Sequence, residues 1–162
     1  MKDRSPDLAR SVSPCIAAAT RAAARRLTQL YDEVMAPSNL RVTQYHLLSE
    51  LERWPGSSPT VGELAELLTI ERSALGQTLR PLERDGLIKM TRDVSDARRR
   101  LIVLTKAGKT ALAKARVYWA SAHAAFEAYF GETALADLRT TLRGIAEDPE
   151  LLTTFMQERK KL

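Results

Sequence analysis

One stretch in the middle of the chain decides the fold: residues 60–105 have the sequence TVGELAELLTIERSALGQTLRPLERDGLIKMTRDVSDARRRLIVLT. Thr60 and Glu63 form the S/T-x-x-E pattern of a capping box, in which two side chains satisfy N–H groups at the start of a helix. A second helical segment follows Ile70 and ends at Gly86, because glycine readily takes the left-handed conformation that closes a helix. The leucines of this second segment recur at helical spacing: Leu75, Leu79 and Leu82. The stretch therefore begins with two short helices joined by a tight turn.

The remainder of the stretch has the shorter period of β-strands. Residues 87–92 and 100–104 are strand-like in length and in apolar content. The polar segment 93–99 between them predicts a hairpin loop. Two short helices followed by a hairpin are the order of elements in a winged helix-turn-helix. We therefore expect a mainly α fold with a small β-hairpin wing.

The outer face of the second helix carries side chains that suit DNA. Arginine and glutamine can read base edges, and small residues allow close approach to a duplex. This candidate recognition face consists of Arg72, Ser73, Gly76, Gln77 and Arg80. The hairpin tip adds a cationic group that suits phosphates or a narrow minor groove: Arg98, Arg99 and Arg100.

Pro81 interrupts the second helix on this interpretation. A proline inside a helix removes one backbone hydrogen bond and clashes with the carbonyl of Gln77, four residues before it. We therefore expect a bend in this helix or an early end to it.

Amphipathic helices flank the stretch on both sides. Apolar residues between positions 12 and 35 recur at steps of three and four, and Thr43 is placed to cap the next helix. Thr105 is placed to cap another long helix after the hairpin. Six residues of that helix share one stripe: Leu112, Ala115, Trp119, Ala122, Phe126 and Tyr129. Such a stripe needs a helical partner to cover it.

Composition limits the function classes. The chain has 162 residues, 25 Lys+Arg against 20 Asp+Glu, two histidines and one cysteine. These numbers exclude an intrachain disulfide and give no cluster of zinc ligands, so we expect no metal and no cofactor. The sequence contains no G-x-S-x-G, Gly-rich phosphate loop or H-E-x-x-H motif, which argues against an enzyme. No apolar run approaches the roughly 20 residues that cross a bilayer, so we expect a cytoplasmic protein without membrane association.

The stretch also resembles a known family. The segment 79–88, LRPLERDGLI, precedes a D-x-x-D-x-R pattern at 93–98 and the segment LTKAG at 104–108. Together they closely resemble the MarR family of bacterial transcriptional regulators. The resemblance implies a homodimer that binds a palindromic double-stranded DNA operator, acts as a repressor and is released by a small phenolic or other aromatic ligand.

The resemblance also implies a division of the chain. Residues 1–11 would be a flexible tail, 12–36 a dimerisation helix, 40–105 the winged helix-turn-helix DNA-binding lobe and 106–162 further dimerisation helices. The amphipathic stripes support a dimer independently, because a monomer cannot bury all of them.

For the wing, the resemblance implies that Arg98 reaches into the minor groove. Asp93 and Asp96 would orient the wing by pairing with nearby arginines. The alternative is that the two aspartates only cap the loop.

The resemblance further implies an effector pocket between the dimerisation helices and the DNA-binding lobe. The candidate pocket residues are Arg21, Tyr31, Tyr45, His46, Trp54 and Trp119. Each of them also suits ordinary packing, since aromatic residues at helical spacing usually belong to a core.

Two alternative functions remain. Cys15 lies near the expected start of the first helix, where a positive environment favours the reactive thiolate, so the chain can be a peroxide or thiol-redox sensor of the same fold. The sensing branch of the family places a tyrosine where this chain has Val42, which favours the ligand. The other alternative is a winged helix used for protein contacts, which would have an apolar recognition face and an acidic or neutral wing.

Overall fold

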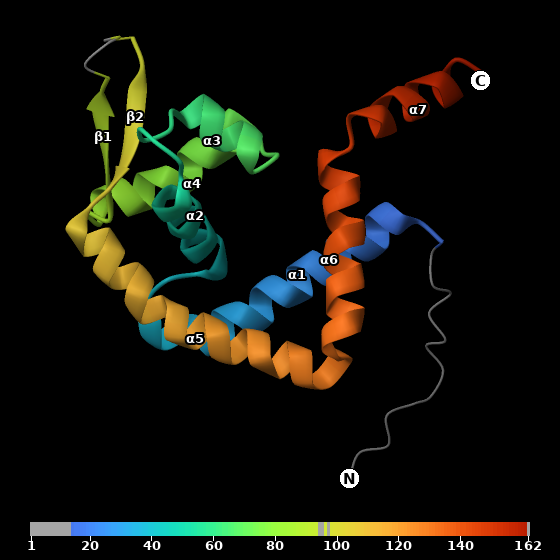
Figure 1. The fold of residues 1–162 in the computed structure, drawn as a ribbon, viewed down its shortest axis with the longest axis horizontal. Coiled ribbons are helices and arrows are strands. Elements are labelled where there is room, and N and C mark those ends of the chain that lie inside the picture. The colour runs from blue at the N-terminus through green and yellow to red at the C-terminus, as the bar shows by residue number, and fades with distance from the viewer. Residues whose placement is uncertain (1–13, 94–95, 97, 162) are drawn as a thin grey trace.

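The computed structural model describes residues 14–93, 96 and 98–161, and it is mainly helical with one two-stranded antiparallel sheet (Figure 1). In chain order the elements are α1 (Ile16–Met35), the 3-10 helix η1 (Ala36–Ser38), α2 (Val42–Arg53), α3 (Val61–Leu67), α4 (Arg72–Arg84), β1 (Ile88–Arg92), β2 (Arg100–Leu104), α5 (Lys106–Phe130), α6 (Glu132–Glu147) and α7 (Pro149–Arg159). The expected fold class, a winged helix-turn-helix with flanking long helices, is confirmed. No helix in this part of the chain is long and apolar enough to cross a membrane.

The capping box forms as the sequence predicts. The Glu63 N–H donates to Thr60 Oγ1 at 3.2 Å, and the Thr60 N–H donates to Glu63 Oε2 at 2.7 Å. Gly86 has φ +71°, and the hairpin pairs Met90 with Ile102. These local signals fix the start of α3, the end of α4 and the register of the wing.

The hydrophobic core lies inside the winged-helix lobe. Leucines of α2, α3 and α4 and an isoleucine of each strand pack together in it, with one residue of α1 and two of α5 closing it from below (Figure 1). The largest members that are almost fully buried are Met35, Leu48, Leu64, Leu75, Leu82, Ile88, Ile102 and Leu112. The lobe therefore has a hydrophobic core made within one chain.

Two helix starts differ from the expectation. The helix α1 begins at Ile16, because Cys15 is its extended N-cap residue; positions 12 and 13, like the tail 1–11, lie outside the described residues. The helix α2 begins at Val42, so Thr43 is not its cap. The first N–H groups of α2 find other acceptors: the Arg41 N–H donates to Gln44 Oε1 at 3.0 Å, and the Val42 N–H donates to Asp32 Oδ1 at 2.7 Å.

The expected early end of α4 at Pro81 is wrong. The helix continues to Arg84, and the Asp85 N–H donates to the Pro81 carbonyl at 2.9 Å, so the backbone ladder resumes after the proline. Leu82, the next residue, is fully buried, and its packing holds the last turn in place.

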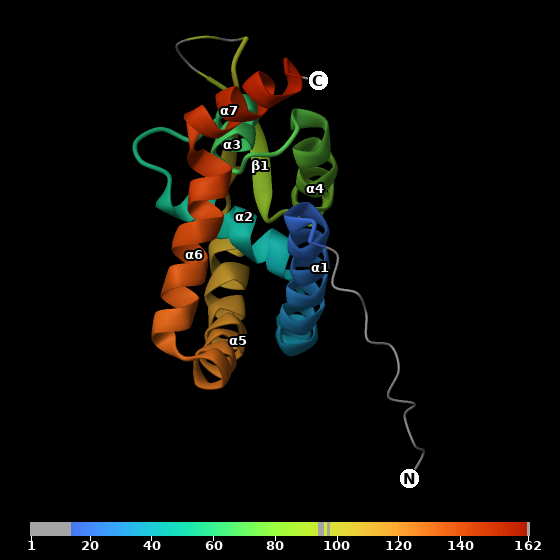
Figure 2. The ribbon, with the colours of Figure 1, turned by 90° about the vertical axis from the view of Figure 1, so that its right-hand side faces the viewer.

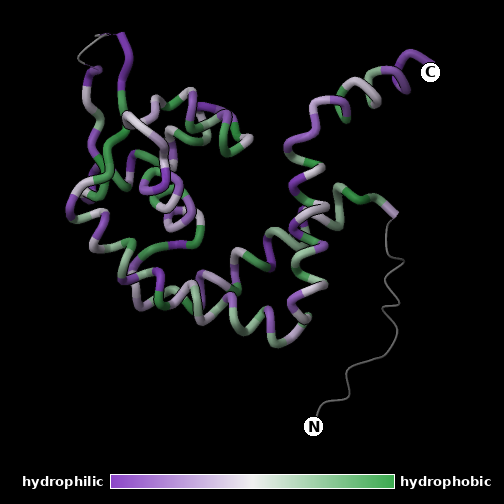
Figure 3. The backbone as a smooth tube through the Cα atoms, in the orientation of Figure 1, coloured by the Kyte–Doolittle hydropathy of each residue, from purple (hydrophilic) through white to green (hydrophobic). Residues whose placement is uncertain are grey.

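The C-terminal helices extend away from this core. The helix α6 starts at the end of α5 that is remote from the lobe, and α7 continues from it (Figures 1 and 2). Neither helix contains a buried residue in the described chain. Apolar residues nevertheless recur along both (Figure 3), and the large exposed ones are Leu138, Leu142, Ile145, Leu152, Phe155 and Met156.

Candidate nucleic-acid interface

The candidate recognition face forms on α4. Arg72, Ser73, Gln77 and Arg80 are exposed, while the three leucines of the same helix are buried on the other side. No heavy atom lies within 4 Å of the position that a Cβ would occupy on Gly76. The face is therefore open to a large partner along its length.

Arg72 is held against the preceding helix. Its guanidinium packs over Gly62 of α3, where a Cβ on the glycine would lie 3.1 Å from Arg72 Nη2. A larger residue at position 62 would push this arginine aside, so the glycine lets Arg72 lie close to α3.

The three wing arginines are not equivalent. All are exposed, but Arg99 Nη2 lies 2.8 Å from Glu63 Oε1 and its Nη1 lies 3.7 Å from Asp93 Oδ2. Among the described residues, Arg98 and Arg100 have no side-chain ion pair. Positions 94, 95 and 97 of the wing loop lie outside the described residues.

The two wing aspartates have different contacts: one pairs with an arginine and the other caps the loop. Asp93 pairs with the side chain of Arg99, as an orienting residue would. Asp96 caps the loop instead: its Oδ1 accepts the Arg98 N–H at 2.9 Å, and its carbonyl accepts the Arg99 N–H at 2.9 Å.

Glu63 connects α3 to the wing. Hydrogen bonding by the backbone and the side chain of Thr60 holds the pKa of its carboxyl below the ordinary value of 4.5, and the charge of Arg99 lowers that pKa further. The carboxyl is therefore ionised at neutral pH and attracts the wing arginine.

Three of the six candidate effector residues share one cavity. Tyr45 and His46 of α2 and Trp119 of α5 line a hollow of about 350 Å³, and the rings of Tyr45 and Trp119 stack with centroids 5.6 Å apart. Tyr31 lies next to this group through His123, whose ring stacks on Trp119 and whose Nδ1 is 3.4 Å from the Tyr31 hydroxyl. The remaining lining residues are Val42, Ser49, Arg53 and Arg116.

The other candidates do not line this cavity. Arg21 is exposed on the first half of α1, and Trp54 is the C-cap residue of α2. Arg53 and Arg116 were not among the residues expected from the sequence, although helical spacing was an available signal: Arg53 follows His46 by seven residues, and Arg116 precedes Trp119 by three. Arg116 pairs with Glu52, and this hydrogen bond raises the pKa of the guanidinium.

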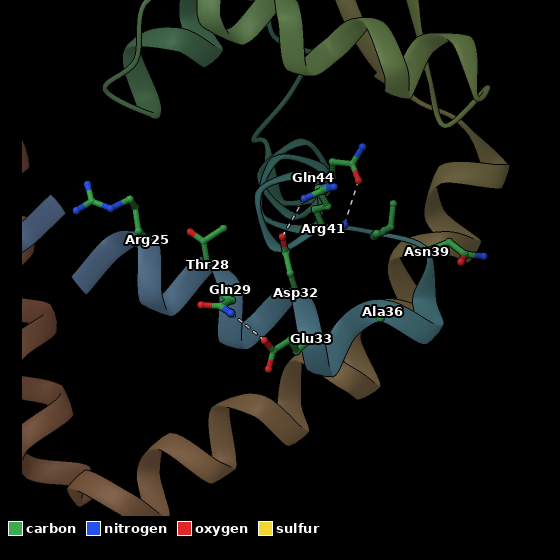
Figure 4. Close-up of a pocket in the computed structure, with 10 residues that line it drawn as sticks. Arg25, Thr28, Gln29, Asp32, Glu33, Ala36, Asn39, Arg41 and Gln44 are labelled. Atoms are coloured by element: carbon green, nitrogen blue, oxygen red, sulfur yellow. Dashed lines mark hydrogen bonds and ion pairs between the residues drawn. The ribbon is translucent and has the colours of Figure 1, made fainter. Parts of the chain in front are cut away.

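A larger hollow of about 680 Å³ lies between α1 and the start of α2 (Figure 4). Asp32 reaches across it from α1 and lies 3.5 Å from Arg41 Nη1, while Gln29 donates to Glu33 on α1 itself. None of the candidate effector residues lines it. Cys15 is exposed at the other end of α1, about four turns from Tyr31.

Known proteins share this arrangement of elements and identify the family of the chain. The model of the MarR family matches residues 40–99. The transcriptional regulator MosR of M. tuberculosis, solved in complex with DNA, is 33% identical, with 85% of this chain and 98% of MosR covered and a TM-score of 0.75. The chain belongs to the MarR family. It is therefore a DNA-binding transcriptional regulator of the MarR type and not an enzyme.

Two further relatives extend the comparison. The transcriptional repressor CouR, bound to a 23-mer DNA duplex, is 26% identical with a TM-score of 0.74, over 91% of this chain and all of CouR. CouR has also been solved bound to p-coumaroyl-CoA. The transcriptional activatory protein BadR of Rhodopseudomonas palustris is 32% identical over 94 residues, which are 57% of this chain. The matched region spans only half the length of BadR.

Proposed function

We propose that this MarR-type regulator binds a roughly palindromic operator as a homodimer, represses transcription there and is released by a small aromatic ligand. The observation that carries the proposal is the open polar face of α4 beside an arginine-rich wing, in a chain whose relatives MosR and CouR bind DNA. Repression follows CouR, whereas BadR is an activatory protein. We place this function in the cytoplasm, where a bacterial regulator meets the chromosome.

A second copy of the chain is the proposed partner of the long helices. Residues 12–36 and 106–162 form the dimerisation region in this proposal, and 40–105 form the DNA-binding lobe. The exposed apolar residues of α6 and α7 support it, because a soluble monomer rarely leaves such a large apolar surface uncovered.

The proposed DNA contacts divide into two groups. The residues of α4 enter the major groove, where Gln77 and Arg80 read base edges and Ser73 and Gly76 allow close approach. Arg72 reaches a phosphate, and Arg98 inserts into the minor groove beside Arg100.

Selection of bound duplexes from a random pool tests sequence-specific binding. We expect an enriched palindrome whose half-sites lie about one helical turn apart. Gln77→Ala and Arg80→Ala should each lower the free energy of discrimination between the preferred base and its competitors by about 1–3 kcal/mol. Arg84→Ala, on the same helix but paired with Asp85, should leave this discrimination unchanged. A pool without enrichment would refute the proposal, and a reporter gene behind the selected operator then distinguishes repression from activation.

The ligand proposal rests on the cavity of Tyr45 and Trp119. Two aromatic walls suit an aromatic ring, and Arg53 and Arg116 at the same cavity, which pair with Glu50 and Glu52 in the structure, would bind a ligand carboxylate by exchanging one of these exposed pairs for it. The ligand must bind the form that releases DNA more tightly than the form that binds it, since only differential affinity shifts the equilibrium. The structure of the relative CouR bound to p-coumaroyl-CoA supports this ligand class.

Operator release by a panel of aromatic acids and by an organic peroxide tests the ligand against the thiol. The ligand proposal predicts release by an acid in the parent protein and in Cys15→Ser, and loss of that release in Arg116→Gln. Release by peroxide in the parent alone would instead establish redox sensing through Cys15. Retention of DNA with every acid would contradict the ligand proposal.

A further inference from the structure

Arg99 binds two carboxylates at once. Its guanidinium lies 2.8 Å from Glu63 of α3 and 3.7 Å from Asp93 at the base of the wing loop. Its backbone is held as well, since the Arg99 N–H donates to the Asp96 carbonyl and the Asp93 N–H donates to the Arg99 carbonyl at 3.0 Å. One residue therefore ties together both ends of the wing loop and a neighbouring helix.

The carboxylate of Glu63 is also held by a hydrogen bond that does not involve Arg99. One carboxylate oxygen accepts the Thr60 N–H at the start of α3, and the other accepts from Arg99 Nη2. A carboxylate at a helix N-terminus is further stabilised by the helix dipole. The partner of Arg99 is thus anchored to the helix-turn-helix and not to the wing.

We infer that Arg99 is a positioning residue that fixes the wing against α3 and so sets where Arg98 meets the DNA, while Arg99 itself contacts no phosphate. This inference rests on the proposed contact between the wing and DNA. It separates Arg99 from Arg98 and Arg100, which the sequence placed in one group of DNA ligands.

Charge balance supports this assignment. A phosphate would have to displace two carboxylates from Arg99, and Glu63 would then lose its charged partner beside the DNA backbone. In the observed arrangement the single positive charge of the guanidinium is shared between these two carboxylates. Arg98 and Arg100 keep their full charge for the nucleic acid, because neither has an ion pair within the described residues.

The substitution Glu63→Gln tests the inference, because the loss of a negative charge and the loss of wing positioning predict opposite changes in the affinity for DNA. A glutamine oxygen still accepts the Thr60 N–H, so the capping box survives, but the charged partner of Arg99 is lost. By charge alone, removal of a carboxylate near DNA tightens binding. If Arg99 positions the wing, Glu63→Gln should weaken binding about two- to fivefold at operators that are A·T-rich beneath the wing.

The matched control is Glu66→Gln, which removes the same charge from the same helix without touching Arg99. We expect it to leave the affinity unchanged or slightly tighter. Arg99→Gln should weaken binding as Glu63→Gln does, and the double variant should be no weaker than either single variant. Arg99→Lys should recover part of the affinity, because lysine still pairs with Glu63 as a point charge.

Amide hydrogen exchange of the free protein tests the clamp without DNA. Glu63→Gln and Arg99→Gln should both speed exchange of the Asp93 and Arg99 amides, and Glu66→Gln should not. Unchanged exchange, or tighter DNA binding by Glu63→Gln, would overturn the inference. If the parent protein selected no operator, the proposed function would fail and the exchange data alone would decide whether the clamp exists.

Discussion

The winged-helix lobe and the C-terminal helices have the same kind of apolar spacing but differ in what covers it. Leu75 and Leu82 of α4 are fully buried, whereas Leu138 and Leu142 of α6 are 48% and 40% exposed. Both pairs belong to amphipathic helices. Periodicity therefore identifies the apolar face of a helix but not the surface that covers it, which for α6 would be the second copy of the proposed dimer.

The largest expected effect comes from a charge on the apolar face of α6. Leu138→Glu should be harmless in a monomer, but in a dimer interface it buries an unpaired carboxylate at a cost of about 3 kcal/mol or more per subunit. Sedimentation should show a dimer for the parent and for Thr140→Glu, which lies on the opposite face, and a monomer or unfolded chain for Leu138→Glu. If the parent were a folded monomer at micromolar concentration, the apolar face of α6 would not be covered by a second copy of the chain.

The lobe should respond to a cavity within its own core. Leu64→Ala removes a fully buried side chain of α3 and should lower the free energy of unfolding by about 2–5 kcal/mol. Leu67→Ala, on the same helix but 52% exposed, should change it by less than about 1 kcal/mol. Chemical denaturation measures both changes. Equal losses for the two variants would show that Leu67 is also covered, and the lobe would then not be complete in one chain.

The elements of the lobe were predictable because their signals are local. Thr60, Glu63, Gly86 and Thr105 each act within three residues of the helix end that they mark. The start of α2 had one local signal, Gln44, which accepts the Arg41 N–H three residues before it, but the other acceptor, Asp32, lies on another helix. A local reading of the sequence cannot show a contact that depends on how α1 packs beside α2.

The candidate site divides in the same way. The exposed face of α4 followed from its three leucines, since the outer residues of one helix are fixed once its inner ones are known. The cavity was predicted only in part: Tyr45 and Trp119 meet, but Arg21 and Trp54 lie elsewhere. The contact between Arg99 and Glu63 joins residues 36 positions apart and has no local signal.

Substitutions at one glycine of the lobe and one glycine of α6 should have smaller effects. Neither Gly76 in α4 nor Gly144 in α6 has a heavy atom within 4 Å of a built Cβ. Alanine at either position should therefore raise the free energy of unfolding by about 0.5–1 kcal/mol, because glycine is a poor helix former. Only Gly76→Ala should also weaken operator binding, since its methyl group stands on the face that approaches DNA. Equal operator affinity for both variants would place the DNA away from Gly76.

The smallest expected effect is a pH dependence confined to the lobe. The pKa of Glu63 is lowered in the folded state, chiefly by the hydrogen bonds from Thr60 and then by Arg99. A carboxyl with a lowered pKa stabilises the fold above its unfolded value, near 4.5, and this contribution is lost as the pH falls through the folded value. Melting temperatures of the parent should therefore drop more steeply below about pH 5 than those of Glu63→Gln, which has no proton to bind, and Glu66→Gln should follow the parent. Parallel curves for the parent and Glu63→Gln would mean that the capping box and the wing arginine do not hold the charged form of Glu63 in solution, and the clamp between α3 and the wing would lose its anchor.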